Sequence, residues 1–142
     1  MTIQTTNYGD YRIIDKIDNQ TIEILFQFED EYYVYNKGKK INRVIFNIAL
    51  EVYNKRKHIY NNENKKLSTG KTPFTTVVKG IKMFKELEQY VIEDNPYQEI
   101  IFFCTWLDNR RRDAYHKILS KYGYDYGFLF NKKCIMKKVL TF

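Results

Sequence analysis

The stretch that decides the fold is STGKTPFTTVVKGIKMFKELEQYVIEDNPYQEIIFFCTW, residues 68–106. From Pro73 to about Ile92, apolar residues recur at helical spacing and polar residues fall on the other side, which predicts an amphipathic helix. The apolar positions are Phe74, Val77, Val78, Ile81, Phe84, Leu87 and Val91, and the polar ones are Lys79, Lys82, Lys85, Glu86 and Glu88. After the break at Asn95-Pro96, the run from Glu99 to Trp106 has the apolar, β-branched and aromatic makeup of a strand buried on both faces. Helix and strand should pack as neighbouring layers.

The N-terminal region predicts an antiparallel meander of three short strands. These strands are Arg12 to Ile17, Thr21 to Phe28 and Glu31 to Asn36. The polar breaks Asp18-Asn19-Gln20 and Glu29-Asp30 are of hairpin type, and a basic turn around Gly38 ends the meander.

Residues 41–53 fit two periods at once. Val44, Phe46, Ile48, Leu50 and Val52 alternate, as in a strand, yet Ile41, Val44, Ile45, Ile48, Ala49 and Val52 also mark a helical stripe. The enrichment in β-branched residues favours a strand. Residues 54–66 form the most polar interval and predict a basic loop or hairpin tip.

A second helix is expected from Asp108 or Asn109, either of which can cap it, to about Tyr122, where Gly123 stops it. It should bury Ala114, Tyr115, Ile118 and Leu119. Residues 126–130 and 134–140 then predict a hairpin across residues 131–133. The order of elements indicates an α/β fold with a single mixed, largely antiparallel sheet flanked by two main helices.

Length and composition favour one domain, residues 1–142, that builds its core without metal or disulfide. Cys104 and Cys134 lie in predicted strands without ligand spacing, so both are expected to be core residues in a reducing compartment. No N-terminal apolar segment and no apolar run of about 20 residues occurs. We therefore expect a cytoplasmic protein that does not enter a membrane.

Charge is distributed unevenly along the chain, whose net charge is +7. Residues 1–36, the acidic meander, carry two basic and seven acidic side chains, and the remainder has an excess of twelve basic ones. Such polarity can steer an anionic partner to the C-terminal part, or bring unlike faces of two copies together. A solvated lysine-rich surface is the simpler interpretation.

Several motifs in residues 67–130, within the basic part 67–142, resemble the C-terminal half of the GNAT (GCN5-related N-acetyltransferase) fold, and in particular uncharacterised bacteriophage members. The matching stretches are Ser68-Thr69-Gly70, Phe74 to Phe84, Ile100 to Cys104, Arg112-Asp113-Ala114-Tyr115 and Tyr122-Gly123-Tyr124. The match covers nearly half of the chain. The N-terminal meander is compatible with the family but carries no motif.

In active family members a Gly-rich turn at the helix start binds the pyrophosphate of coenzyme A, as helix N-termini favour anions. The resemblance assigns that role to Thr69, Gly70, Lys71 and Thr72. The sequence departs from the family pattern because it has no second glycine and Pro73 removes a donor. The cofactor of an active protein would be acetyl-CoA.

The family also uses a Tyr to protonate the departing thiolate, and Tyr115 resembles it, although Gly123 lies about one helical turn too far from it. Glu23 and Glu99 are the candidate general bases, because a desolvated carboxylate can have a raised pKa. No metal site is predicted, since His58 and His116 lack partners at ligand spacing. Arg110, Arg111 and Arg112 begin a helix, where a carboxylate or an anion must offset them.

Three functions fit these observations. The first is a phage-type GNAT-like protein, degenerate as an acetyltransferase, that acts as a virion-associated or host-interacting accessory protein through a viral or host protein partner. The second is an active acetyl-CoA-dependent N-acetyltransferase. The third is a nucleic-acid-binding protein that uses residues 55–57, 110–112 and 132–133 on phosphates and Tyr side chains on bases. Exposed aromatic strands at a sheet edge would allow a homo-oligomer.

Overall fold

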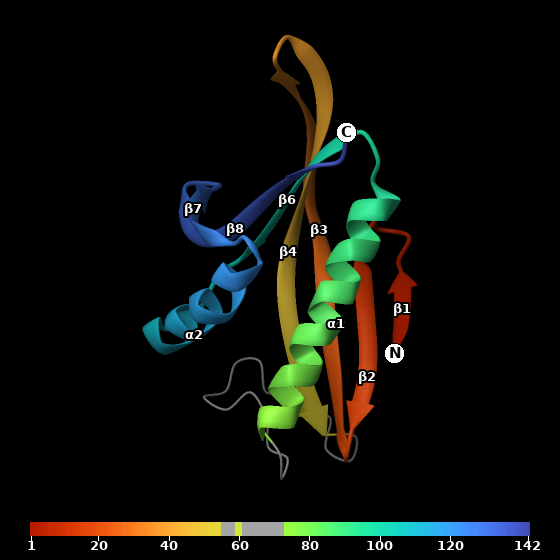
Figure 1. The fold of residues 1–142 in the computed structure, drawn as a ribbon, viewed down its shortest axis with the longest axis vertical. Helices are drawn as coiled ribbons and strands as arrows, with labels where there is room; N and C mark the ends of the chain where they lie inside the picture. The colour runs from red at the N-terminus through yellow and green to blue at the C-terminus, as the bar shows by residue number, and fades with distance from the viewer. Residues whose placement is uncertain (55–58, 61–72) are drawn as a thin grey trace. The chain divides into compact units, whose positions relative to one another are not determined.

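The computed structural model describes residues 1–54, 59–60 and 73–142 of the chain, which is α/β with a single mixed sheet. The path of neighbouring strands in the sheet is β1-β2-β3-β4-β6-β8-β7, and β5 pairs with β4 off this path. Figure 1 shows the ribbon. The chain divides into two compact units, which we call unit 1 (residues 1–27 and 48–94) and unit 2 (residues 28–47 and 95–142). Whether they act as the one domain expected from the sequence stays a prediction.

Unit 1 contains β1 (Thr2–Thr5), β2 (Tyr11–Ile17) and β5 (Ile59–Tyr60). It also holds the first part of β3 (Gln20–Asn36), the last part of β4 (Lys39–Asn54) and helix α1 (Pro73–Asp94). β1, β2 and β3 pair antiparallel in chain order, as expected of a meander, although β1 itself was not predicted.

Helix α1 confirms the predicted amphipathic helix and begins at Pro73, a residue suited to a first helical position. In Figure 1 α1 runs along β2 and β3. Its buried stripe packs on these strands, where Phe84 meets Phe26 at 5.7 Å between ring centroids and Tyr90 meets Tyr11 at 6.1 Å. Tyr11 also donates a hydrogen bond to Asp94. Two side chains differ from expectation, since Val78 is exposed and Glu88 is buried.

Unit 2 contains β6 (Gln98–Cys104), β7 (Asp125–Leu129), β8 (Lys132–Leu140), α2 (Asn109–Leu119) and the short 3-10 helix η1 (Ser120–Tyr122). β6 pairs parallel with β4 and antiparallel with β8, and β8 pairs antiparallel with β7. The expected doubly buried strand is confirmed, because every residue of β6 after Gln98 is buried. Gly123, with φ of +91°, ends η1 as expected.

β3 and β4 form one long hairpin, and this corrects one expected break. β3 runs without interruption through Glu29-Asp30, where the sequence predicted a turn. The predicted turn around Gly38 is confirmed: Lys37 and Gly38 both have positive φ, as in the two-residue turns that suit paired strands. The strand alternative for residues 41–53 is confirmed. Most of the predicted basic loop 54–66 lies outside the described residues.

Helix α2 buries less apolar surface than its sequence predicted. Ala114, Tyr115, Ile118 and Leu119 are only half-buried, and the one fully buried residue of this helix is Arg111. Its N-cap is Asp108, one of the two expected. Neither helix in the described ranges is long and apolar enough to cross a membrane.

Candidate functional site

Glu99, one of the candidate general bases, is buried at the start of β6 and held by two cations. Arg43 donates from Nε to Oε2 of Glu99, and Nζ of Lys138 lies 3.5 Å from Oε1. Arg43 in turn donates to the Tyr32 hydroxyl at 3.2 Å. Each carboxylate oxygen of Glu99 is therefore paired with a cation, as in a structural ion pair.

Glu23, the other candidate base, lies on β3 in unit 1, with its Oε1 3.5 Å from Nη1 of Arg12. Close to it is Glu51 on β4. Burial, and next the charge of Glu23, raises the pKa of Glu51 above its ordinary value. A carboxylate with a raised pKa is the better proton acceptor near neutral pH. In unit 1 the group most like a general base is thus Glu51, which sequence patterns alone did not single out.

Tyr115, the candidate acid, is half-buried on α2 in unit 2. Burial raises the pKa of its phenol, and the charges of Cys104 and Asp108 add to this rise, while Arg111 opposes it. A phenol with a raised pKa is protonated at neutral pH, as a proton donor must be. Tyr115 and Glu99 both belong to unit 2, where no interaction between them occurs among the described residues, and Glu23 belongs to unit 1.

Thr69, Gly70, Lys71 and Thr72, the candidate cofactor-binding residues, lie outside the described residues. The described part of that region begins with α1 itself, at Pro73.

The first turn of α2 concentrates positive charge. It carries Arg110, Arg111 and Arg112 and no acidic residue. The Asp108 side chain caps the turn by accepting from the Arg111 backbone N–H at 2.8 Å. Arg112 pairs with Asp113 at 3.0 Å, so part of the predicted offset by carboxylates is confirmed.

Arg111 is the unusual member of this turn, because its side chain is buried. The residue is 8% exposed, and its Nη1 lies 3.6 Å from Oδ2 of Asp108, beyond hydrogen-bonding distance. Its Nε has no hydrogen-bond acceptor in the described part of the chain. A buried donor without an acceptor is costly and is rare in folded proteins.

An aromatic cluster surrounds Tyr126 on β7. The ring of His116, from α2, stacks on the Tyr126 ring with centroids 4.3 Å apart and planes 10° apart. Trp106 meets the same ring edge-on at 6.1 Å, and Nζ of Lys133 lies 5.0 Å from its centroid. His116 Nε2 also lies 3.3 Å from Oδ1 of Asp125. Side chains from the β6–α2 loop, α2, β7 and β8 therefore converge on one ring.

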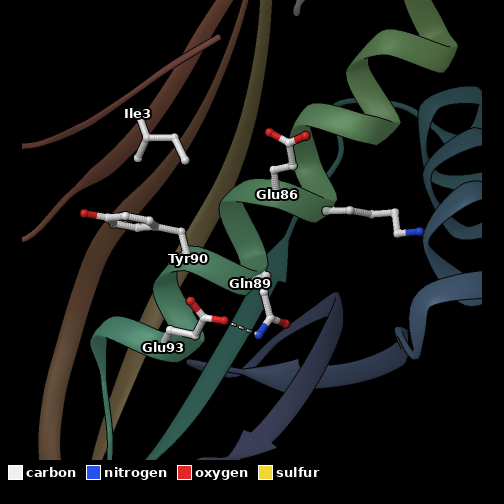
Figure 2. A pocket seen from close by; sticks show the side chains of 6 residues that line it. Ile3, Glu86, Gln89, Tyr90 and Glu93 are labelled. Atoms are coloured by element: carbon white, nitrogen blue, oxygen red, sulfur yellow. Dashed lines mark hydrogen bonds between the residues drawn. The ribbon is translucent and has the colours of Figure 1, made fainter.

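A recess of about 420 Å³ lies in unit 1 beside α1 (Figure 2). Its lining consists of Ile3, Lys85, Glu86, Gln89, Tyr90 and Glu93. Gln89 donates to Glu93 within it at 2.9 Å. Two carboxylates against one ammonium give the recess a negative charge, which disfavours an anionic cofactor such as acetyl-CoA.

The two cysteines occupy the core, as predicted. Cys104 and Cys134 are buried free thiols on β6 and β8. Burial, with a smaller contribution from Cys134, raises the pKa of Cys104 to about 12, so its thiol is not a nucleophile at neutral pH. No group of residues able to hold a metal ion occurs within residues 1–54, 59–60 and 73–142.

No protein-family model, curated protein or solved structure matches this chain. The GNAT resemblance of residues 67–130 therefore stays a prediction from short motifs.

The sequence pointed to part of this site. It singled out the three arginines and the aromatic excess, but it did not indicate that Arg111 is buried, nor did it indicate Trp106, Tyr126 or Glu51. Glu51 carried a usable signal, since it is the one charged residue in the apolar run 44–52. The stacking of His116 on Tyr126 joins residues ten positions apart, across η1, and depends on how α2 packs on β7.

Proposed function

We propose that this chain is a phage-type GNAT-like domain that no longer transfers acetyl groups and works by binding, as a virion-associated or host-interacting accessory protein. Its place would be the host-cell cytoplasm or the virion, and its partner a macromolecule of virus or host.

The order and pairing of the elements support the fold part of this proposal. The resemblance implies a strand, a helix, an apolar strand, a second helix and final strands, and the chain follows that order in β4, α1, β6, α2, β7 and β8. The parallel pair of β4 and β6 is the arrangement that a crossover helix such as α1 allows. In the proposed fold the two helices flank the sheet.

The ion pairs of Glu99 support the proposal that the chain no longer transfers acetyl groups. An acetyltransferase needs a carboxylate or other base that can accept a proton from the substrate amine. Glu99 is committed to Arg43 and Lys138. A carboxylate in this state positions β4, β6 and β8 and is a structural group.

Acetyl transfer is the second candidate, and one observation favours it. Glu51 has a raised pKa and lies near Glu23, and Tyr115 has the protonation state of an acid. For an active enzyme, Glu51 is the candidate base of unit 1, and residues 69–72 of the same unit are the candidate residues for acetyl-CoA.

Calorimetric titration of the full chain with acetyl-CoA separates the two candidates. A binding protein should give no heat of binding at millimolar acetyl-CoA. Micromolar binding that Gly70→Asp abolishes would overturn the proposal in favour of the enzyme, because the new carboxylate would repel the pyrophosphate.

The matched control is Gln27→Glu, which adds the same charge at an exposed position of β3. Thiol release from acetyl-CoA in the presence of mixed primary amines is the second readout. Turnover that Glu51→Gln removes would likewise establish the enzyme, since this variant keeps the shape of the side chain and loses its basicity.

A further inference from the structure

We propose that unit 2 binds single-stranded nucleic acid on one surface, formed by Trp106, Arg112, His116, Tyr126, Phe128 and Lys133, which we call the aromatic–basic surface. This inference rests on the proposed function, because it names the partner class of a protein that works by binding.

The net charge of unit 2 favours a polyanionic partner. Unit 2 has thirteen basic and seven acidic side chains, a net charge of +6, whereas unit 1 has eleven and ten, a net charge of +1. Nearly all of the positive charge of the chain therefore belongs to unit 2. An excess of this kind attracts a polyanion, and the phosphate backbone supplies most of the affinity in nucleic-acid binding.

Exposed aromatic rings lie beside a lysine on β7 and β8. Phe128 follows Tyr126 by two residues on β7, so both side chains leave the strand on one face, and they are 72% and 37% exposed. Lys133 stands opposite Phe128 across the β7–β8 pair. Exposed rings beside lysines are what single-stranded nucleic acids use, since bases stack on the rings and phosphates meet the cations.

The cluster around Tyr126 gives the surface its order. His116 stacks on the Tyr126 ring, Trp106 meets the edge of that ring, and Nζ of Lys133 lies 5.0 Å from its centroid. Arg112 lies one helical turn before His116 on the same side of α2. Because these side chains already hold one another, little conformational entropy is lost when a base stacks on them.

The first turn of α2 supplies an independent sign of an anion. Three arginines lie at the positive end of the helix dipole and oppose it, Asp108 caps the turn, and Asp113 pairs with Arg112. The guanidinium of the buried Arg111 lies at this end, near Asp108, and its Nε has no acceptor in the part of the chain that the structure describes. A phosphate oxygen at this turn would offset the charge of the arginines.

Fluorescence anisotropy with the full chain and a labelled single strand of about ten thymidines tests the inference. We expect saturable binding that weakens steeply between about 50 and about 200 mM salt. The single Trp of the chain, Trp106, lies in the surface, so its emission should be quenched along the same isotherm.

Variants locate the contact. Phe128→Ala should weaken binding about tenfold through lost stacking. Lys133→Ala and Arg112→Ala should each weaken it several-fold and reduce the salt slope by about one. The matched controls in unit 1 are Tyr8→Ala, an exposed ring, and Lys82→Ala, an exposed ammonium, and both should leave affinity within about twofold.

Three results would overturn the inference: no saturable binding at low salt, equal losses in surface and control variants, or displacement of the strand by AMP or inorganic phosphate at equal concentration. The last would make the ligand a small phosphate compound. A matched duplex that binds as tightly as the single strand would also contradict it, because paired bases cannot stack on the rings. None of these results restores acetyl transfer, which the acetyl-CoA titration decides separately.

Discussion

Units 1 and 2 contain the same types of residue but differ in which of them are buried and which are exposed. In unit 1 the long helix α1 buries an apolar stripe in which Met83, Leu87 and Val91 are fully buried. The basic and acidic side chains of unit 1 nearly balance in number. In unit 2 the short helix α2 encloses only an arginine, and aromatic rings remain at the surface. Both units have a buried core, and they differ in how much aromatic and basic surface their helices and strands leave exposed, which is why we propose the recognition surface in unit 2.

The largest expected effect comes from the two cores. Leu87→Ala in unit 1 and Ile101→Ala in unit 2 should each cost about 3 kcal/mol of unfolding free energy, because both side chains are buried. Urea unfolding measures the loss, and hydrogen exchange locates it. If each variant exposes amides of its own unit only, the units are separate in stability; equal exposure in both would remove that distinction.

The next largest effect should come from neutralising a carboxylate, and the loss of stability should differ between the two units. Glu99→Gln in unit 2 should cost about 2 kcal/mol, since it leaves Arg43 and Lys138 with a neutral acceptor. Glu23→Gln in unit 1 should cost less than about 1 kcal/mol, because its partner Arg12 is one-third exposed. Denaturation of both variants checks the contrast. Equal costs would show that the two cations around Glu99 give it no special structural role.

Replacing a glycine by alanine should lower stability in unit 2 and raise it in unit 1. Gly123→Ala should destabilise by about 1 kcal/mol, since φ is +91° there, a conformation that is strained for a residue with a Cβ. Gly80→Ala in α1 should stabilise by about 0.5–1 kcal/mol, because a helical Cβ there meets nothing within 4 Å among the described residues. Thermal unfolding at one scan rate compares them. A gain at Gly123 would refute the αL ending of η1.

The smallest effect concerns Glu51. Its pKa is raised in the folded state, so the folded protein binds this proton more tightly than the unfolded chain, and ionisation lowers stability as pH rises past the ordinary value of 4.5. Glu51→Gln should therefore stabilise at pH 7 and have no such effect well below pH 4.5. Stability measured across that range tests this, with Gln27→Glu as the unrelated surface variant. Stabilisation that persists unchanged at low pH would contradict ionisation of Glu51 as its cause.

Much of the fold could be predicted from local sequence. The 3.6-residue period of α1, the apolar run of β6 and the Gly123 stop are strong local signals, and each is confirmed. The break expected at Glu29-Asp30 was wrong because pairing along the long β3–β4 hairpin overrides a local turn preference. Strand β1 has no apolar pattern and exists through its pairing with β2.

The candidate site could be predicted only in part, since it depends on distant contacts. A run of three arginines is usually solvated, and nothing local to Arg111 indicates burial. The ion pairs of Glu99 require β4 and β8 to lie on either side of β6. Tyr115, by contrast, was selected from a motif, and its role as an acid stays a prediction.

Hydrogen–deuterium exchange of the full chain tests the division of labour between the units most directly. It should be measured with the oligonucleotide and, separately, with acetyl-CoA. We predict that the oligonucleotide protects amides in residues 106–116 and 125–133 of unit 2, that it leaves α1 unchanged, and that acetyl-CoA protects neither unit. Protection of the start of α1 by acetyl-CoA, with no response of unit 2 to the oligonucleotide, would contradict both the binding role and its location.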